Sequence, residues 1–320
     1  MVLSFDKSNF SVFLAPMAGV TDRAFRAVVD SFGSSAMCSE MVSAKALVYG
    51  DKKTFSLMER DDYSAFYGVQ IFGHEPDYLA EAARIITNVD FIDINMGCPA
   101  AKIIKNNDGG ALLKNVRLIE KIVKAVRCAS SVPVTVKIRS GFDSSTVNAV
   151  DAAKAAEAGG ASAVCVHPRT VKQQYSGKAD YSIIGKVSAG VSVPVIGSGD
   201  VICVNDAARM VNDCGVSAVM IGRAALGRPW FLKEVMNYLS GSDGGVLCAD
   251  KFATAEKHLK LLAEFKGETI GMLEARKHIS WYFKGENGAS ALKQKAHAAS
   301  TLQQMLDIIG EARERSVHAS

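Results

Sequence analysis

Short apolar runs rich in Val, Ile and Phe alternate with amphipathic stretches over the first three quarters of the chain. The runs that we predict to be strands are residues 12–17, 36–41, 66–72, 91–95, 132–138, 163–168, 193–199 and 217–222. The stretches between them have helical spacing, as in residues 75–87, 115–128 and 204–215. Nearly continuous apolar strands separated by helices are typical of a parallel sheet that helices cover. Eight such units in about 240 residues favour a (β/α)8 TIM barrel over an open doubly wound sheet, which stays the alternative.

Small polar residues and glycines mark where these helices should begin and end. Thr21 and Asn205 precede helical stretches, and we predict them to be N-caps because their side-chain oxygens can accept a free backbone N–H. Gly33, Gly159 and Gly215 fall where three of the helices should stop.

The composition changes after the last predicted strand and its helix. Residues 241–250, GSDGGVLCAD, form a Gly/Ser/Asp stretch that is typical of a linker. Residues 251–320 show helical periodicity with almost no strand signal. We therefore expect a barrel at residues 1–240, a linker at 241–250 and a small all-helical C-terminal domain at 251–320.

The composition also limits the class of protein. The 320 residues are 48% hydrophobic and 22% charged, which is ordinary for a globular protein. No apolar run approaches the ~18 residues that span a bilayer, and the start lacks the layout of a secretory signal, so we expect a cytoplasmic protein. The seven scattered cysteines include no C-x-x-C pair and no Cys/His cluster with zinc spacing, so we expect neither disulfides nor a metal. A net charge of +4 permits an anionic partner.

Polar or special residues follow nearly every predicted strand. They are Pro16, Met17, Glu40, Gln70, Asn95, Cys98, Lys137, Arg139, His167, Arg169, Ser198, Gly199, Asp200, Gly222 and Arg223. A (β/α)8 barrel builds its site at the carboxyl ends of its strands, because the following loops converge there. One such residue alone would suit a helix cap or a surface group. A whole ring of them predicts the site.

The loops after the last two predicted strands carry glycines where a helix begins. The first contains Gly199 and Asp200, and the second contains Gly222 and Arg223. Backbone N–H groups at such turns bind phosphate, and these two loops are the usual phosphate site of such barrels. Arg223 would add a charge-assisted contact. We predict a phosphate site that suits flavin mononucleotide or a sugar phosphate.

Lys137 and His167, at the ends of two neighbouring predicted strands, each have several possible roles. Lys137 and Arg139 lie two residues apart and so point the same way. Lys137 could form a Schiff base, hold the edge of a flavin ring, or pair with Asp93 or Glu40. His167 could act as a general acid, donate a hydrogen bond to a cofactor, or be a satisfied rim histidine. The residues by themselves leave these alternatives open.

Several motifs resemble those of the tRNA-dihydrouridine synthases. They are APMAGVTDRAFR, SEMVSAKAL, VQIFG, DINMGCPAAKIIKNNDGGALL, VTVKIRSGFD, HPRTVKQQYSGKADY, IGSGD and MIGRAALGRPW. The likeness covers about residues 12–235 and continues through ARKHISWYFKG into the helical tail, where it is most similar to the bacterial B-type branch. The resemblance implies an FMN enzyme that uses NADPH to reduce the C5–C6 double bond of particular uridines in tRNA.

By position, the resemblance also implies roles for single residues. Contacts to the flavin would come from Pro16, Met17, Ala18, Gln70, Lys137 and His167. The ribityl chain and phosphate would be bound by Ser198, Gly199, Asp200, Gly222 and Arg223. The uracil would face Asn95, Arg139 and Arg169. The family more often has Asn in place of Ser198, whose shorter side chain keeps only a hydroxyl.

Cys98 lies between a glycine and a proline directly after a strand, where it is either a catalytic group or one more small buried side chain. The resemblance favours catalysis. Hydride transfer to C6 of uracil leaves a proton to be added at C5 from the opposite face. A thiol with a pKa near ~8.5 is mostly protonated at neutral pH and can serve as that acid. The downstream KIIKNNDGG is predicted to close over the substrate, with its glycines as hinges.

The helical tail carries a basic run with two aromatic residues. Between residues 272 and 295, Arg276, Lys277, Lys284, Lys293 and Lys295 outnumber Glu274 and Glu286. Trp281 and Tyr282 interleave with these bases. We expect the aromatic side chains to point inward and the bases outward, toward the phosphates of tRNA.

Other functions stay open. A dihydroorotate dehydrogenase-like FMN barrel would act on a free pyrimidine, but it needs neither the helical tail nor its basic run. A phosphosugar aldolase that uses Lys137 would leave NMGCP unexplained. A non-catalytic RNA-binding module is at odds with the filled ring of polar residues. We expect a monomer by default.

Overall fold

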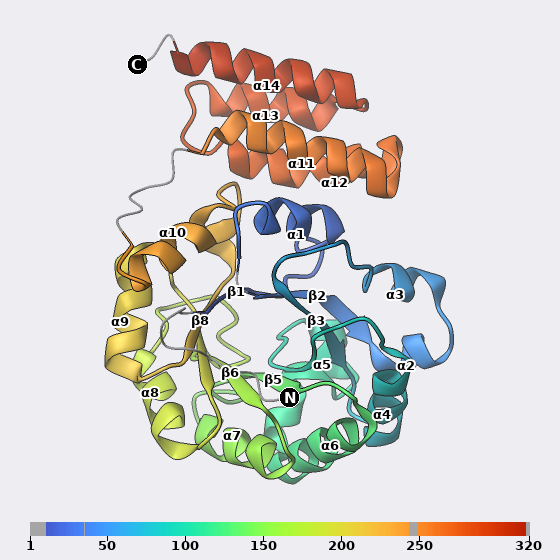
Figure 1. Ribbon diagram of the computed structural model, residues 1–320, viewed down its shortest axis with the longest axis vertical. Helices are drawn as coiled ribbons and strands as arrows, with labels where there is room; N and C mark the ends of the chain where they lie inside the picture. The colour runs from blue at the N-terminus through green and yellow to red at the C-terminus, as the bar shows by residue number, and fades with distance from the viewer. Residues whose placement is uncertain (1–10, 35, 243–248, 318–320) are drawn as a thin grey trace.

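The computed structural model describes residues 11–34, 36–242 and 249–317, and in it eight parallel strands close into a barrel in chain order (Figure 1). The strands are β1 (Ser11–Leu14), β2 (Ala36–Ser43), β3 (Phe66–Phe72), β4 (Phe91–Met96), β5 (Val134–Arg139), β6 (Ala163–His167), β7 (Val195–Ser198) and β8 (Ala218–Ile221). β1 pairs with both β2 and β8, which closes the sheet. The predicted (β/α)8 barrel is confirmed.

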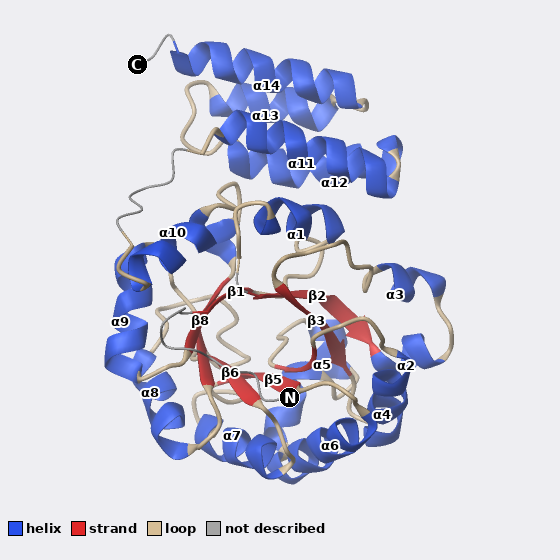
Figure 2. Ribbon diagram, in the orientation of Figure 1, coloured by secondary structure: helices blue, strands red, loops and turns tan. Residues whose placement is uncertain are grey.

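The helices of the barrel lie mostly on its outer side (Figure 2). They are α1 (Arg23–Asp30), α2 (Ala44–Val48), α3 (Lys52–Ser56), α4 (Pro76–Ile85), α5 (Ala101–Lys105), α6 (Val116–Ala129), α7 (Ala149–Ala158), α8 (Tyr181–Gly190), α9 (Val204–Cys214) and α10 (Phe231–Leu239). Of these, α5 is drawn inside the ring of the others in Figure 2. Two 3₁₀ turns, η1 (Gly109–Lys114) and η2 (Arg223–Ala225), follow β4 and β8. The short helices α2, α3 and α5 were not expected from the sequence, because five residues are too few to show a helical period.

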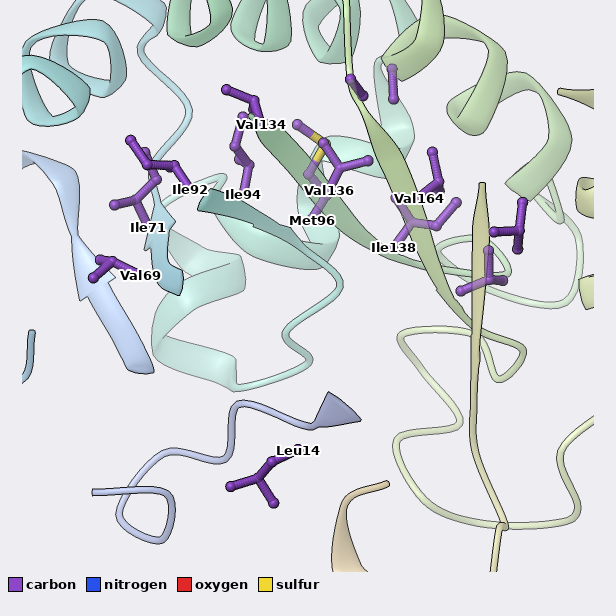
Figure 3. Packing of buried hydrophobic residues seen from close by; sticks show 14 of the residues in the cluster. Leu14, Val69, Ile71, Ile92, Ile94, Met96, Val134, Val136, Ile138 and Val164 are labelled. Atoms are coloured by element: carbon purple, nitrogen blue, oxygen red, sulfur yellow. The ribbon is translucent and has the colours of Figure 1, made fainter. Parts of the chain in front are cut away.

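The strands are apolar on both faces because each face packs against a different core. The outward side chains, among them Leu14, Ile92 and Val136, pack against the helices (Figure 3). The inward side chains fill the barrel with a second cluster, which includes Phe13, Phe91 and Met220. Two-sided burial explains the nearly continuous apolar runs in the sequence.

Two of the predicted helix caps are wrong by one or two residues. Asp22, not Thr21, caps α1, and its Oδ1 accepts the Phe25 N–H at 2.9 Å. The Thr21 hydroxyl instead accepts the backbone N–H of Met17 at 2.8 Å. The N-cap of α9 is Cys203 rather than Asn205. The ends of α7 and α9 fall at Gly159 and Gly215 as predicted, whereas α1 ends at Ser31, two residues before Gly33.

The chain beyond the barrel is helical, as expected. Its helices are α11 (Lys251–Lys266), α12 (Glu268–Tyr282), α13 (Ala289–Ala298) and α14 (Leu302–Val317). They pack around a core of their own, which also takes in Ala24 of α1 and Trp230 beside α10. The helical layer accordingly lies against α1 and α10 in Figure 1.

The predicted division into domains stays a prediction. Residues 243–248 of the predicted linker lie outside the described residues, as do 1–10 and 318–320 at the ends of the two predicted domains. Among the residues that are described, no helix has the length and apolar character to cross a membrane. The same residues contain no group of three or more His, Cys, Asp or Glu side chains placed to hold a metal ion.

Candidate active site

The predicted site residues come together at the carboxyl ends of the strands, because inward side chains recur every second residue. On β4 the inward series runs from Phe91 through Asp93 to Asn95, and on β6 it runs from Ala163 to His167. Each series is apolar at the start of its strand and polar at its end. The barrel is therefore a packed floor with a polar mouth.

A chain of side-chain hydrogen bonds crosses the mouth from β5 to the segment after β4. Thr135 Oγ1 and Gln70 Nε2 donate to the Asp93 carboxylate at 2.6 and 2.7 Å. Asn95 Nδ2 donates to Gln70 Oε1 at 2.8 Å, and Asn95 Oδ1 accepts the backbone N–H of Cys98 at 2.9 Å. Because Asp93 accepts from Gln70, the orientation of both amides is fixed.

This chain of bonds gives Asn95 and Gln70 a role that the sequence did not indicate. The side-chain oxygen of Asn95 accepts the backbone N–H of Cys98, and its side-chain nitrogen donates to Gln70. Burial raises the pKa of Asp93, although the bonds from Thr135 and Gln70 favour the ionised form. The predicted contacts of Asn95 to uracil and of Gln70 to flavin stay predictions. Asn95 Nδ2 also donates to Met41 Sδ at 3.1 Å, whereas Gln70 keeps one N–H outside this chain of bonds.

Cys98 is half-buried at the edge of the mouth. Burial raises the pKa of its thiol, and the Ala100 N–H and the charges of Arg139 and Lys137 oppose this effect without outweighing it. The thiol therefore stays protonated at neutral pH. The backbone carbonyl of Cys98 accepts the Gly110 N–H at 3.1 Å, and this bond connects Cys98 to the start of η1.

The predicted closing segment KIIKNNDGG is folded as α5 and the start of η1. Its two glycines, predicted to be hinges, are buried in close contacts. A Cβ on Gly110 would lie 2.5 Å from Val171, and one on Gly109 would lie 2.8 Å from Ile103. Close packing explains why glycine is needed here, and movement of the segment stays a prediction.

Lys137 and His167 both point polar atoms into the mouth without a partner. No ion pair or hydrogen bond of Lys137 occurs within the described residues, and Glu40, one of its possible partners, instead accepts the Gly19 N–H. His167 Nε2 is buried and has no hydrogen-bond partner among the described residues. Burial, with the charges of Lys137, Arg139, Arg169 and Arg223, lowers the pKa of His167 to about 2. The imidazole is therefore neutral.

The loop after β7 lies beside the end of β6, and the loop after β8 lies beside the loop after β1. Gly199 has φ +120°, and a Cβ there would lie 3.1 Å from the His167 ring. A Cβ on Gly222 would lie 3.6 Å from Met17 Sδ. Within the part of the chain that is described, the backbone N–H groups of Gly199, Asp200 and Gly222 donate no hydrogen bond. Free N–H groups at glycines, where no side chain blocks the approach, are suited to bind a phosphate.

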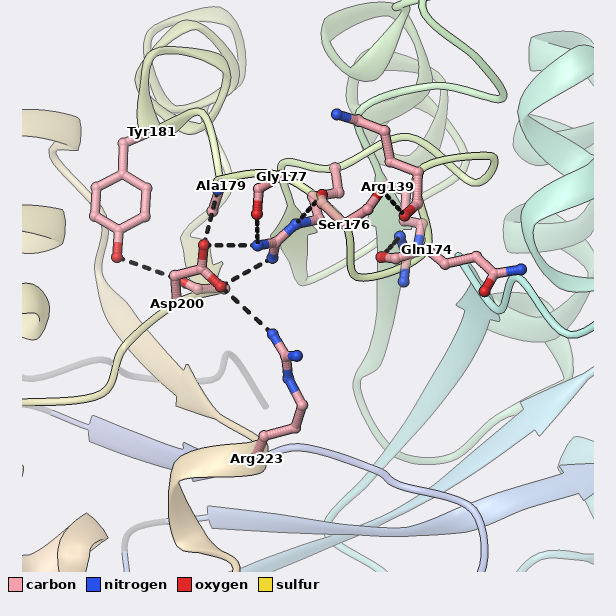
Figure 4. A network of polar contacts seen from close by, with 11 residues as sticks. Arg139, Gln174, Ser176, Gly177, Ala179, Tyr181, Asp200 and Arg223 are labelled. Carbon is pink, nitrogen blue, oxygen red and sulfur yellow. Dashed lines mark hydrogen bonds and ion pairs between the residues drawn. The ribbon is translucent and has the colours of Figure 1, made fainter.

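Asp200 is held by two arginines, as Figure 4 shows. Arg169, only 2% exposed, donates from Nη1 and Nη2 to the two Asp200 oxygens at 2.9 and 2.7 Å. Arg223 lies 3.4 Å from the same carboxylate and is half-exposed. Burial alone would raise the pKa of Asp200, but the bonds from Arg169 hold it below its usual value. Arg223 is left with donors for an anion in the mouth.

Two buried arginines brace the loop after β6. Arg139 Nη1 donates to the carbonyls of Thr170 and Gln174 at 2.9 and 2.6 Å. Arg169 donates to the carbonyls of Ser176 and Gly177 in the same loop at 3.0 and 2.7 Å (Figure 4). The uracil contacts predicted for Arg139 and Arg169 stay predictions: Arg169 is used by this loop and by Asp200, whereas Arg139 bonds to the loop through Nη1 alone.

The braced loop presents Tyr175, which sequence reasoning missed. Tyr175 is 55% exposed, and its ring lies 5.5 Å from the Arg139 guanidinium and 4.8 Å from that of Arg223. The signal in the sequence was an aromatic residue inside a polar loop, KQQYSG. An exposed ring beside the mouth suits stacking on a nucleobase.

The basic run of the helical tail is only partly free. Tyr282 and Phe283 are buried as expected, while Trp281 is half-buried. Lys295 pairs with Glu311 at 2.7 Å, and Lys277 lies 3.7 Å from Glu274. Lys284 and Lys293 have no ion pair within the described residues. The basic run is therefore less positive than its composition suggested.

The helical tail contacts the two loops that carry predicted flavin residues. Lys266 of α11 reaches Asp22, the cap of α1, at 2.5 Å and Glu274 at 2.6 Å. In the loop after β8, a Cβ on Gly227 would lie 2.5 Å from the backbone of Trp281 in α12. The loops after β1 and β8 thus join the mouth to the tail.

A family model described as Dihydrouridine synthase (Dus) matches residues 13–317. The chain belongs to the dihydrouridine synthase family. It is 41% identical to the tRNA-dihydrouridine synthase B of Xanthomonas campestris pv. campestris over 303 residues, which cover 92% of this chain and 90% of that one. It is 39% identical to the tRNA-dihydrouridine synthase B of Vibrio cholerae, over 93% of this chain and 94% of that one.

Solved structures share the barrel at low sequence identity. The 6-hydroxypseudooxynicotine amine oxidase of Pseudomonas geniculata N1 aligns with TM-score 0.56 and 13% identity over 72% of this chain. The histamine dehydrogenase of Rhizobium sp. 4-9 aligns with TM-score 0.53 and 12% identity over 78%. This chain spans about half the length of each, 47% and 48%, so the likeness concerns the fold alone.

The residues of the mouth fit the flavin that family membership implies. The buried, unpartnered Nε2 of neutral His167 and the unpaired Lys137 offer hydrogen bonds to a ring with carbonyl and nitrogen acceptors. The free N–H groups at Gly199 and Gly222, with Arg223 nearby, offer a place for a phosphate.

Proposed function

We propose that this protein is a tRNA-dihydrouridine synthase that uses FMN and NADPH to reduce the C5–C6 double bond of uridines in tRNA. The observation that carries the proposal is a protonated thiol, Cys98, fixed by Asn95 in the same mouth as Lys137 and His167. Family membership and the names of the relatives support the same reaction.

In this proposal, FMN would supply the hydride when bound, with NADPH as its reductant. His167 and Lys137 hold the ring, and Pro16, Met17 and Ala18 contact it from the loop after β1. Ser198, Gly199, Asp200, Gly222 and Arg223 bind the ribityl chain and phosphate. Asp200 does so through its backbone, because its carboxylate is held by Arg169.

Cys98 holds a proton on Sγ and delivers it to C5 of the uracil. Its raised pKa keeps that proton in place until the base arrives. Once the proton has left, the positive charges of Arg139 and Lys137 favour the thiolate that remains. Asn95 positions the thiol through the backbone N–H of Cys98. Tyr175 and Arg139 stand on the side of the mouth where the base enters.

A uridine in folded tRNA must leave its stack to reach this mouth. Lysines on the helical tail, Lys284 and Lys293 in particular, are free to meet phosphates. We expect tRNA binding to weaken steeply as salt is added. A flat response would argue against a basic face that binds the RNA.

The test is to incubate the purified holoprotein and NADPH with tRNA that lacks dihydrouridine, and in parallel with orotate and free uridine monophosphate. We expect a yellow protein that forms dihydrouridine only in tRNA. Reduction of a free pyrimidine at a similar rate would favour the dihydroorotate dehydrogenase-like alternative. Colourless protein that forms no dihydrouridine would refute the proposal.

A further inference from the structure

A second hollow lies beside the mouth, between the loops after β2 and β3 and the segment KIIKNNDGG that was predicted to close over the substrate. Its volume is about 520 Å³, which is within the range of small-molecule sites. Its lining includes Lys45, Phe72, His74, Tyr78, Lys102 and Asn106.

The hollow and Cys98 adjoin the same glycine, Gly109. Ile103 and Asp108 belong to the lining of the hollow. A Cβ on Gly109 would lie 2.8 Å from Ile103 Cγ2 and 3.1 Å from Cys98 Cβ, so this glycine is packed closely against both residues. The hollow therefore lies next to the proposed acid. Its lining includes residues of α2, α4 and α5, which lie on the same side of the barrel, near β3, in Figure 1.

The side chains in the hollow combine aromatic faces with polar and cationic groups. Phe72 and Tyr78 are partly exposed, and Tyr78 shares a 2.8 Å hydrogen bond with Tyr49, whose side chain is 69% exposed. The exposed Asn106 amide and the His74–Asp108 pair, at 2.8 Å, provide donors and acceptors.

Two lysines in the hollow are available to an anion. Lys102 makes no ion pair within the described residues. Lys45 lies 3.4 Å from Glu75 with both side chains about half-exposed, and such exposed pairs are weak. Lys45 also lies 4.9 Å above the Tyr78 ring, so a cation and an aromatic face are next to each other. Stacking surfaces with nearby lysines are the usual means of binding single-stranded nucleotides.

We propose that this hollow is a nucleotide subsite that takes the base and phosphate next to the reduced uridine in the RNA. This inference rests on the proposed function. A strand that places one base in the mouth brings its neighbour to the adjoining hollow. The base lies against Tyr78 and Phe72, Asn106 contacts its edge, and Lys45 and Lys102 contact the phosphate. The adenosine phosphate end of NADPH has the same chemistry, so the test must separate the two sources.

The test compares the double variant Lys45→Ala/Lys102→Ala with the control Lys121→Ala/Lys124→Ala, which removes the same charge from the exposed face of α6. Both are measured as holoenzymes for flavin content, KM for NADPH, and tRNA binding by fluorescence anisotropy over a range of salt. We expect the first variant alone to bind tRNA about tenfold more weakly, with a salt slope smaller by about one to two. Flavin content and KM for NADPH should not change.

Other results have defined meanings. A raised KM for NADPH with unchanged tRNA binding would assign the nucleotide subsite to the reductant. Equal behaviour of the two double variants on both measures would overturn the subsite. In that case the wild-type protein would still form dihydrouridine, whereas failure of the proposed function would leave the wild type itself inactive.

A second measurement concerns the identity of the base. Transcripts that differ only at the nucleotides next to the target uridine are compared with wild-type protein and with Asn106→Ala. We expect a preference in kcat/KM for the wild type that the variant loses, without a change in flavin content. Equal use of all transcripts by both proteins would show that Asn106 does not contact the base, and would overturn that part of the subsite.

Discussion

The hydrogen-bonded series in the barrel mouth and the histidine pair at the contact between barrel and helical tail differ in how their buried polar groups are satisfied. In the mouth, Asp93, Gln70 and Asn95 satisfy one another in an unbroken series of hydrogen bonds. At the contact with the tail, both ring nitrogens of His278 and Nε2 of His258 are buried without a hydrogen-bond partner among the described residues. The two imidazoles lie 4.4 Å apart and pack on Phe25 of α1.

The difference shows what each region can tolerate. A satisfied polar series keeps charge and direction fixed, which a site needs in order to place a thiol. His258 Nδ1 lies 3.4 Å from the Tyr282 hydroxyl, but the other three ring nitrogens of the pair have no partner in the described part of the chain, so the pair packs largely as an apolar group and holds together only while both imidazoles are neutral. Loss of a hydrogen-bond partner should therefore destabilise the mouth, and a fall in pH should destabilise the contact with the tail.

Breaking the Arg169–Asp200 pair should have the largest effect on stability. Arg169→Met leaves the two Asp200 oxygens and the carbonyls of Ser176 and Gly177 without their donor, and the loss of one partner of a buried pair costs about 3–5 kcal/mol. Chemical denaturation of the apoprotein measures the change. The control Arg84→Met removes an exposed arginine and should cost less than about 0.5 kcal/mol. Equal losses in the two variants would contradict this account of the loop.

Acid should weaken the contact with the tail by an intermediate amount. Burial lowers the pKa of His258 to about 4 and lowers that of His278 well below its usual value. The unfolded chain binds these protons near pH 6.5, so stability is lost as the pH falls below about 6.5. Between pH 7 and 5.5 the pair should cost about 2 kcal/mol in the free energy of unfolding.

The matched variant is His278→Phe, which keeps a ring of similar size against Phe25. Its unfolding free energy should fall less between pH 7 and 5.5 than that of the wild type. His167 in the mouth, whose pKa is also lowered by burial, contributes equally in both proteins, so the difference between them reports on His278. An unchanged pH dependence would show that the imidazoles are not the groups that titrate.

The ion pair between Lys266 and Asp22 should have a smaller effect. Lys266→Met removes the cation between Asp22 and Glu274, but the side chain is 22% exposed, so we expect a loss of about 1–2 kcal/mol. Hydrogen exchange of residues 15–22 should speed up in the apoprotein, because Asp22 also caps α1. The exposed Lys260→Met serves as the control. If hydrogen exchange of residues 15–22 were the same in the two variants, the ion pair would not stabilise the loop after β1.

The sequence predicted the barrel well, because buried parallel strands leave continuous apolar runs such as 66–72, which coincides with β3. It placed the mouth correctly, because strand ends converge in such a fold. It could not show that Arg139 bonds to the Gln174 carbonyl, 35 residues away, or that this loop presents Tyr175. Such contacts depend on how distant loops meet, and local patterns carry no trace of them. The cap of α1 was missed because Thr21 and Asp22 are adjacent and both can cap a helix.

The most direct test of the account is the reaction of Cys98→Ala holoenzyme with tRNA. NADPH should bleach this variant as fast as the wild type, while dihydrouridine formation, measured in the tRNA by mass spectrometry, should fall at least about 100-fold. That result would separate the supply of the hydride from the delivery of the proton. A yield of dihydrouridine within about twofold of wild type would contradict the role of the thiol, and with it the purpose assigned to the hydrogen-bonded series that holds it.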